Sequence, residues 1–194
     1  MMIDTLKKEG FSDRILEAFE KVPREYFVPE EHKEKSYEDM PLPIAGGQTI
    51  SQPYTVAFML SLLGVEEGQK VLDVGSGSGY VLALLSKLNK TGQIKGIEVI
   101  KELAEKSRDN LEGYKNVEVI QGNVLRDLGN EEFDRIIVDA AFEEIPTDII
   151  NNNLKFKGKM IVPVRNSIYE ITKESGENKV KEYPGFRFVP IIKE

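Results

Sequence analysis

The clearest indication of the fold is the run Val71-Leu72-Asp73-Val74-Gly75-Ser76-Gly77-Ser78-Gly79-Tyr80. It predicts a short buried strand, a glycine-rich turn and the first residue of a helix, so that backbone N–H groups can approach a ligand closely. A dinucleotide fingerprint would need its third glycine at the position of Tyr80. The Gly-Lys-Ser/Thr ending of a phosphate-binding loop is also missing. The turn therefore favours a nucleoside-containing cofactor without a pyrophosphate.

An acidic residue follows at the distance expected of a ribose-binding carboxylate, about twenty positions further on. This residue, Glu98, ends the next apolar run, and an ionised carboxylate there can accept hydrogen bonds from two ribose hydroxyls. Ligands of open α/β sheets bind beyond the carboxyl ends of the strands, where Asn123 and Asp139 are also expected. S-adenosylmethionine (AdoMet) is the cofactor that these features favour.

Each of these residues also has a purely structural explanation. The glycine turn could be a helix entry without a ligand, and Glu98 an exposed charge at the end of a strand. We expect Asp73 beside the methionine part of the cofactor, although it could instead cap the turn that follows. Asn123 could accept a hydrogen bond from the adenine amino group or simply occupy a turn.

Composition excludes several classes of function. The chain has 194 residues, enough for one α/β domain, and its net charge of −7 argues against nucleic-acid binding. It has no cysteine, which excludes disulfides, thiolate zinc sites and cysteine nucleophiles, and we expect no metal site. The only histidine, His32, lies in a charged run and is expected at the surface. Without a membrane-spanning stretch or a signal peptide, a cytoplasmic location is expected.

Strands and helices alternate after residue 65, which predicts a Rossmann-like α/β fold: a three-layer sandwich around a mostly parallel sheet. Predicted strands are Lys70–Val74, Ile94–Glu98, Val117–Gln121, Arg135–Asp139 and Lys159–Val164, and predicted helices are Tyr80–Leu88, Lys101–Leu111 and Pro146–Asn153. Three short strands, Ser167–Lys173, Lys179–Tyr183 and Arg187–Ile192, are predicted to complete the sheet with a C-terminal β-hairpin.

The first 64 residues are expected to belong to the same single domain of residues 1–194 and to carry the substrate-binding part, whereas residues 65–194 form the cofactor-binding sheet. Ser12–Lys21 reads as a helix with Ser12 at its N-cap, and Thr55–Leu63 as a helix ended by Gly64. Between them, residues 30–54 predict a long ordered loop of the kind that usually has a function.

Three polar residues, Gln48, Thr49 and Ser51, lie in this loop within a stiff frame of prolines and glycines. Ser51 or Thr49 could cap the next helix, with Pro53 in its first turn. Alternatively, the same side chains could take part in catalysis. Spacing alone favours neither explanation.

The loop and the glycine turn together resemble the protein-L-isoaspartate O-methyltransferase family, a group of AdoMet-dependent enzymes of protein repair. The resemblance extends over nearly the whole chain, and its loop motif is the most specific part. It rests on Val22–Val28, Tyr37–Ile44, Gln48–Tyr54, Leu72–Tyr80, Ala140-Ala141, Glu144–Pro146, Pro163-Val164 and Arg187–Pro190.

The resemblance implies an AdoMet-dependent methyltransferase that acts on isoaspartyl residues of damaged proteins and peptides. By that resemblance, Ser51 takes the active-site position and Glu98 the ribose position. We assign to cofactor binding Gln48, Thr49, Asp73, Gly75, Ser76, Gly77, Ser78, Gly79, Glu98, Asn123 and Asp139. A monomer without nucleic-acid or membrane partners is expected.

Two departures from the family pattern concern the site. The family usually has Gly-Asp-Gly where this chain has Gly122-Asn123-Val124, so an uncharged amide replaces a carboxylate. It also tends to have Pro-Val-Gly and a nearby Gln where this chain has Arg165 and Tyr169. Arg165 could pair with a substrate carboxylate or lie at the surface.

Overall fold

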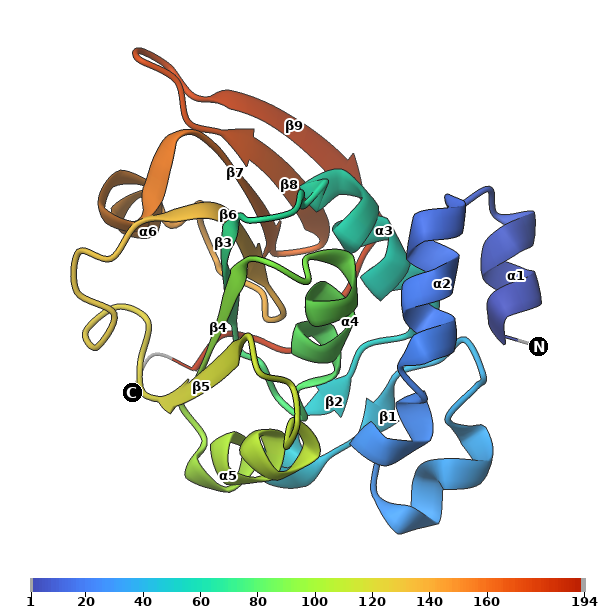
Figure 1. The fold of residues 1–194 in the computed structure, drawn as a ribbon. Helices are drawn as coiled ribbons and strands as arrows, with labels where there is room; N and C mark the ends of the chain where they lie inside the picture. Colours follow the sequence, from blue (N-terminus) through green and yellow to red (C-terminus); the bar gives the residue numbers. More distant parts are fainter. Residues whose placement is uncertain (1, 193–194) are drawn as a thin grey trace.

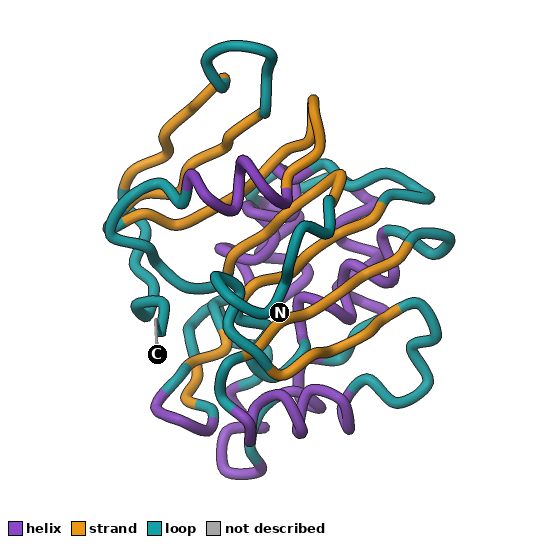
Figure 2. Tube along the Cα trace, turned by 90° about the vertical axis from the view of Figure 1, so that its left-hand side faces the viewer, coloured by secondary structure: helices purple, strands orange, loops and turns teal. Residues whose placement is uncertain are grey.

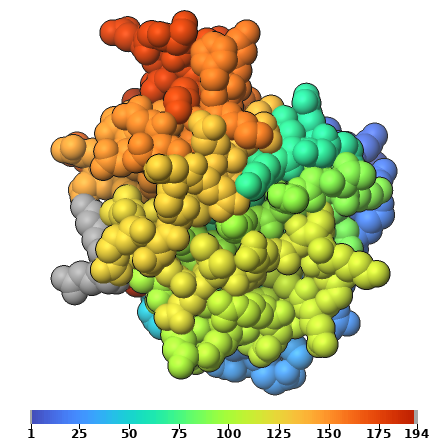
Figure 3. All heavy atoms as spheres, turned by 60° about the vertical axis from the view of Figure 1, so that its left-hand side comes forward, coloured from blue at the N-terminus to red at the C-terminus, as the bar shows by residue number. Residues whose placement is uncertain are grey.

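The computed structural model describes residues 2–192, which surround a seven-stranded sheet of order β5-β4-β3-β6-β7-β8-β9 (Figure 1). The strands are β3 (Lys70–Val74), β4 (Gln93–Glu98), β5 (Val117–Gln121), β6 (Phe133–Val138), β7 (Leu154–Val164), β8 (Ser167–Thr172) and β9 (Lys179–Pro184). Neighbours from β5 to β7 pair in parallel, whereas β8 and β9 form an antiparallel hairpin beside β7. The tip of this hairpin projects from the surface (Figure 3). The predicted mostly parallel sheet with a C-terminal hairpin is confirmed.

Helices cover both faces of the sheet: α6 lies in front of it in Figure 2 and the other helices lie mostly behind. They are α1 (Met2–Lys8), α2 (Asp13–Lys21), α3 (Pro53–Leu63), α4 (Tyr80–Leu88), α5 (Lys101–Asn110) and α6 (Thr147–Asn153). None of the helices within residues 2–192 combines the length and the apolar character that crossing a bilayer requires.

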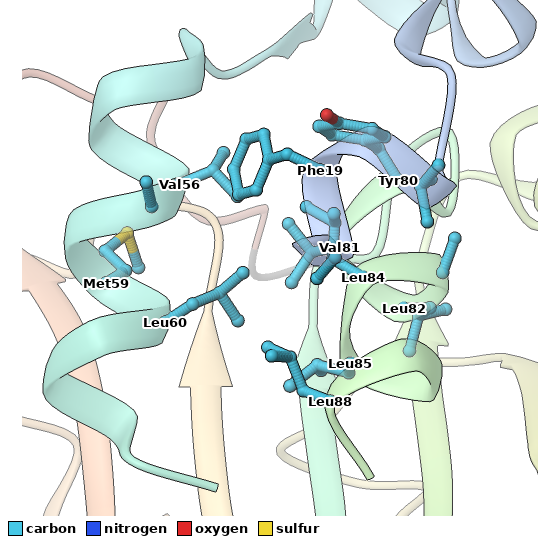
Figure 4. Close-up of a cluster of buried hydrophobic side chains, with 14 of the residues drawn as sticks. Phe19, Val56, Met59, Leu60, Tyr80, Val81, Leu82, Leu84, Leu85 and Leu88 are labelled. Carbon is cyan, nitrogen blue, oxygen red and sulfur yellow. The ribbon is translucent and has the colours of Figure 1, made fainter. Parts of the chain in front are cut away.

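The core consists of two hydrophobic clusters, one on each face of the sheet. Successive strand residues alternate between them: Val71 and Ile137 belong to the cluster under α1–α4, and Leu72 and Ile136 to the cluster on the α6 side. This alternation explains why the central strands read as continuous apolar runs. Figure 4 shows part of the first cluster, where side chains of α3 and α4 meet Phe19 of α2. The N-terminal helices thus share their core with the seven-stranded sheet.

Strand register brings the predicted ligand residues to one edge. Val74 of β3 is aligned with Ile97 of β4 and with Val138 of β6. The residues that follow, among them Glu98 and Asp139, therefore lie side by side at the carboxyl edge of the sheet.

The predicted strand Arg187–Ile192 is wrong. The segment instead runs beside Ala141, whose N–H donates to the Val189 carbonyl (2.8 Å) and whose carbonyl accepts from the Ile191 N–H (2.8 Å). Only an isolated bridge forms, between Ala141 and Pro190. Pro190 has no N–H to donate, so it cannot extend a ladder in this direction.

The other differences concern helix starts, strand ends and caps. Helix α1 has no counterpart among the predicted elements, and β7 begins at Leu154 instead of Lys159. Ser12 occupies the N-cap of α2 without a side-chain cap bond, whereas Gly64 ends α3 in the left-handed conformation as predicted (φ 57°).

The predicted long loop contains two short 3₁₀ helices and a two-stranded ribbon, and a third 3₁₀ helix precedes it. The 3₁₀ helices are η1 (Arg24–Phe27), just before the loop, η2 (Glu30–Lys35) and η3 (Ala45–Gly47). The ribbon pairs β1 (Leu42–Pro43) with β2 (Thr49–Ile50) in antiparallel fashion. We refer to residues 36–54, which include the ribbon and Ser51, as the acceptor loop.

Substitution of Gly79 by alanine should cost more stability than the same change at Gly113. Both glycines have positive φ (+86° and +92°), which costs an L residue about 1–2 kcal/mol. A Cβ on Gly79 would also lie 2.6 Å from Ser107 Oγ and 2.9 Å from Leu111 Cδ1, whereas Gly113 faces open space. With overpacking, Gly79→Ala should lower the free energy of unfolding by about 2–4 kcal/mol in urea titrations. Equal losses at the two positions would contradict this packing role.

Candidate active site

A cavity opens at the carboxyl edge of the sheet, as expected for an open α/β fold. Its lining includes residues 75–78 of the glycine turn, 98–100 after β4, 139–140 after β6, 48–51 of the acceptor loop, and 189–192 near the C-terminus, together with apolar side chains of α3, α4 and α5. The cavity therefore brings together most of the residues that the sequence assigns to the cofactor. We call it the cofactor cavity.

Glu98 connects the glycine turn to the start of α5. It is almost fully buried, and its Oε2 accepts a hydrogen bond from the Gly77 N–H (2.9 Å) while its Oε1 accepts one from the Ile100 N–H (2.9 Å). An ionised carboxylate has about four acceptor sites, so about two remain for a ligand. Glu98 thus shapes the turn and can still receive two ribose hydroxyls.

Asp73 is fully buried at the end of β3, and neither of its carboxylate oxygens has a hydrogen-bond partner. Burial raises the pKa of Asp73 well above its usual range, and the nearby carboxylates of Asp139 and Glu98 raise it further. A buried carboxylate without donors is unfavourable unless another group compensates it. Asp73 does not line the cavity itself.

Asp139 follows β6 and lines the cofactor cavity. Burial, with a contribution from the charge of Glu98, raises the pKa of Asp139 to about 7. None of Asp73, Glu98 and Asp139 forms an ion pair within the described part of the chain. Burial and mutual repulsion therefore disfavour the ionised forms of Asp73 and Asp139, and a ligand with positive charge would stabilise those forms.

The residues present fit AdoMet on observations of this structure. AdoMet carries an ammonium and a sulfonium, which would compensate the carboxylates, and a ribose that matches Glu98. Ser76 lines the cavity, and its buried hydroxyl has no hydrogen-bond partner within the described residues. Among residues 2–192, no group of three or more His, Cys, Asp or Glu is placed to hold a metal ion.

A second cavity adjoins the first, and we call it the acceptor slot. It is lined by Pro41, Thr49, Ser51, Gln52, Thr55, Asp139, Arg187, Phe188 and Val189. Thr49, Ser51 and Asp139 line both cavities. Ser51 is therefore at the junction between the predicted cofactor and an adjoining space open to a second ligand.

The structure argues against a capping role for Ser51 and Thr49. The N-cap residue of α3 is Gln52, and no side chain at that position makes a cap bond. The Tyr54 N–H in the first turn of α3 instead donates to Asp39 Oδ1 (2.8 Å), and Gln52 Nε2 contacts the other oxygen of Asp39 (3.4 Å). Since Asp39 serves the helix end, the Ser51 hydroxyl is available to a ligand.

Three residues that the sequence assigns to the cofactor do not line the cavity: Asp73, Gly79 and Asn123. Gly79 instead permits the close approach of α5 described above. The Asn123 side-chain oxygen accepts a hydrogen bond from the Leu125 N–H (2.9 Å), which is the turn role that the sequence left open. A contact of Asn123 with adenine stays a prediction.

Arg165 also departs from its suggested role in binding a substrate carboxylate. Its Nε donates to the Glu143 carbonyl (3.0 Å), and it lines neither the cofactor cavity nor the acceptor slot.

Sequence reasoning missed two contributions to the site. One is the segment 187–192, which lines both cavities as irregular backbone and had been predicted as a strand. The other is Arg24, which is fully buried and donates to backbone carbonyls of the acceptor loop. The one sequence signal that could have indicated them is that both fall within stretches that resemble the family, Val22–Val28 and Arg187–Pro190.

Comparisons with known proteins agree with this site. A model of the family "Protein-L-isoaspartate(D-aspartate) O-methyltransferase (PCMT)" matches residues 1–194. A curated protein-L-isoaspartate O-methyltransferase 2 from Archaeoglobus fulgidus is 43% identical over 199 residues, covering 98% of this chain and 90% of the relative. A protein-L-isoaspartate O-methyltransferase from Thermococcus onnurineus is 44% identical over 204 residues, covering 99% and 92%.

A solved structure shows the same fold over the full length. It is a protein-L-isoaspartate O-methyltransferase from Plasmodium falciparum in complex with S-adenosyl-L-homocysteine, with a TM-score of 0.88 and 29% identity. The match covers 100% of this chain and 97% of that one. The fold and the family predicted from the motifs are confirmed: the chain belongs to the protein-L-isoaspartate(D-aspartate) O-methyltransferase family.

Proposed function

We propose that this protein transfers a methyl group from AdoMet to the carboxylate of L-isoaspartyl residues in damaged proteins and peptides. The observation that carries the proposal is the position of Ser51, which lines both the cofactor cavity and the adjoining acceptor slot. Family membership and the relative solved with S-adenosyl-L-homocysteine support the choice of cofactor and substrate class. Methylation would start repair, because the ester closes to a succinimide whose hydrolysis returns some normal aspartate.

The reaction makes modest demands on acid–base groups. The acceptor is a carboxylate, which is already ionised at neutral pH, so no general base is needed. This agrees with a chain whose only histidine, His32, lines neither cavity. When bound, AdoMet would supply an electrophilic methyl carbon on a sulfonium and leave as a neutral thioether.

The protein's own contribution would be alignment and exclusion of water. Holding two reactants in line can lower a barrier by about 7–11 kcal/mol. The Ser51 hydroxyl would donate a hydrogen bond to the acceptor carboxylate and fix the direction of the attacking oxygen. A strong ion pair with that oxygen would stabilise the ground state and slow the attack, so a neutral donor is the better choice.

Different residues in and around the cofactor cavity would interact with different parts of AdoMet. Glu98 would accept from the ribose hydroxyls, and Gly75, Ser76, Gly77 and Ser78 would bring backbone close to the rest of the molecule. Asp73 and Asp139 would compensate its positive charge, and Gln48 and Thr49 would close the cavity from the acceptor-loop side. The predicted monomeric state, cytoplasmic location and lack of nucleic-acid or membrane partners stay predictions from the sequence.

The proposal is tested with paired peptides that differ only in carrying an isoaspartyl or an aspartyl residue. We expect methyl transfer to the isoaspartyl peptide alone. Cofactor binding without turnover on either peptide would indicate a non-catalytic AdoMet-binding module. Transfer only to a small-molecule acceptor would indicate a methyltransferase of different specificity.

Ser51→Ala should lower turnover roughly 10- to 100-fold, the effect of removing one donor aligned on a reacting oxygen. AdoMet affinity and thermal stability should change little, because Asp39 rather than Ser51 serves the end of α3. Ser61→Ala is the matched control. Ser61 lies at an exposed position of α3, and its hydroxyl donates to the Ala57 carbonyl. Unchanged turnover in Ser51→Ala would remove Ser51 from the reaction.

Glu98→Ala should weaken AdoMet binding by about 1.5–3 kcal/mol, the contribution of hydrogen bonds to a charged group. Isothermal calorimetry measures the loss directly. Glu105→Ala serves as the control, because Glu105 is an exposed glutamate of α5 that pairs only with Lys101. Equal affinities of the Glu98 variant and the wild type would exclude the ribose contact.

A further inference from the structure

Arg24 is a fully buried arginine whose hydrogen bonds all go to the acceptor loop. Its Nη1 donates to the Ser36 carbonyl (2.7 Å), and its Nη2 to the carbonyls of Met40 and Ser51 (both 3.1 Å). The Ile50 carbonyl lies at 3.5 Å from the same nitrogen. These acceptors come from both ends of the loop, and one of them belongs to Ser51 itself.

The charge of Arg24 makes this arrangement a strong constraint. Burial lowers the pKa of Arg24, an effect that Tyr80 and Asp39 oppose, but a guanidinium stays protonated in proteins. Within residues 2–192 no carboxylate forms an ion pair with it. A buried cation is stable only when its hydrogen-bonding groups are engaged, so the loop carbonyls are held close to it. A planar guanidinium can hold several carbonyls at once, which a lysine ammonium on a flexible stem cannot do in the same geometry.

Arg24 is also close to Tyr80, a residue of the cofactor cavity, because the two side chains interact electrostatically. Tyr80 directly follows the glycine turn and lines the cofactor cavity. Its ring is held by Phe19 (centroids 6.0 Å apart, labelled with Tyr80 in Figure 4) and Phe27 (5.3 Å). The Tyr80 hydroxyl and Arg24 Nε are both buried without a partner, so neither atom secures the guanidinium. The loop carbonyls alone do so.

We propose that Arg24 is a positioning residue for the methyl transfer: it fixes the acceptor loop through the Ser51 carbonyl and so sets the direction of the Ser51 hydroxyl. It does not touch either substrate. This inference rests on the proposed function, because it assigns Ser51 a role in aligning the acceptor. It predicts that loosening Arg24 lowers kcat while cofactor binding, which depends on the sheet edge, persists.

The test compares Arg24→Lys with Arg135→Lys. Arg135 is a matched control because its Nε also donates to a backbone carbonyl, that of Leu63 at the opposite end of α3 (3.0 Å), and it lines neither cavity. We expect kcat on an isoaspartyl peptide to fall about 10-fold or more in Arg24→Lys, with AdoMet affinity within about threefold of wild type. Arg135→Lys should lower the melting temperature while leaving kcat unchanged.

Several results would overturn the inference. Wild-type kcat in folded Arg24→Lys would do so, as would a parallel loss of kcat and AdoMet affinity, which indicates general damage. Equal losses of kcat in Arg24→Lys and Arg135→Lys would also overturn the inference, because the effect would then not be specific to Arg24. An inactive wild-type protein would instead overturn the proposed function, so the two failures are distinguishable.

Hydrogen–deuterium exchange gives a second measurement that does not depend on the Arg24 variant folding. In the wild-type protein, the amides of the acceptor loop that are hydrogen-bonded within it, those of Met40, Ile44 and Gln48, should be protected from exchange. The exposed hairpin turn at residues 174–177 provides the fast reference. Exchange of these loop amides at the rate of that turn would contradict the proposed fixing of the loop by Arg24.

Discussion

The burial of three carboxyl groups side by side at the carboxyl edge of the sheet, with no cation paired to them within residues 2–192, is the constraint on which the site depends. Asp73, Glu98 and Asp139 lie at the ends of three neighbouring parallel strands, where strand register brings them together. The pKa of Asp73 and that of Asp139 are raised, first by burial and then by the neighbouring carboxylates. A fold would gain stability without such a cluster, so its presence is explained by a cationic ligand.

Glu98, one of these three carboxyl groups, also determines the shape of the cavity. By accepting from the Gly77 N–H, it holds the glycine turn over the strand ends, and by accepting from the Ile100 N–H, it holds the start of α5. The acceptor loop is held separately: Arg24 donates to carbonyls near both of its ends, and within the loop Asp39 accepts from the Tyr54 N–H. The cofactor cavity and the acceptor slot are therefore shaped by two structures that meet at the junction lined by Ser51.

The sequence predicted those parts of the fold whose signals are local. The strand Lys70–Val74 and the helix Tyr80–Leu88 were predicted with the bounds that the structure has, because apolar runs and glycine punctuation specify them. Most of the residues predicted for the cofactor line the cavity for the same reason. Pattern alone also indicated the carboxyl edge of the sheet as the ligand site.

What the sequence could not predict depends on partners far away along the chain. The side chain that accepts from the first turn of α3 is that of Asp39, 15 residues before the Tyr54 amide. The burial of Arg24 depends on carbonyls up to 27 residues away, and nothing local distinguishes it from a surface arginine. The segment Arg187–Ile192 has the composition of a strand, but its backbone finds a partner only at Ala141.

The most direct test of the central claim is the proton balance of AdoMet binding. Burial and Glu98 raise the pKa of Asp139 to about 7 in the ligand-free protein, so this group is largely protonated at pH 6. A cation bound beside Asp139 favours its ionised form and lowers its pKa, so binding should release protons, and affinity should rise between pH 5.5 and pH 7. Calorimetry in buffers of different ionisation enthalpy should detect this release in the wild type and a smaller one in Asp139→Asn. Affinity that is flat over this range, with no proton released, would contradict the account.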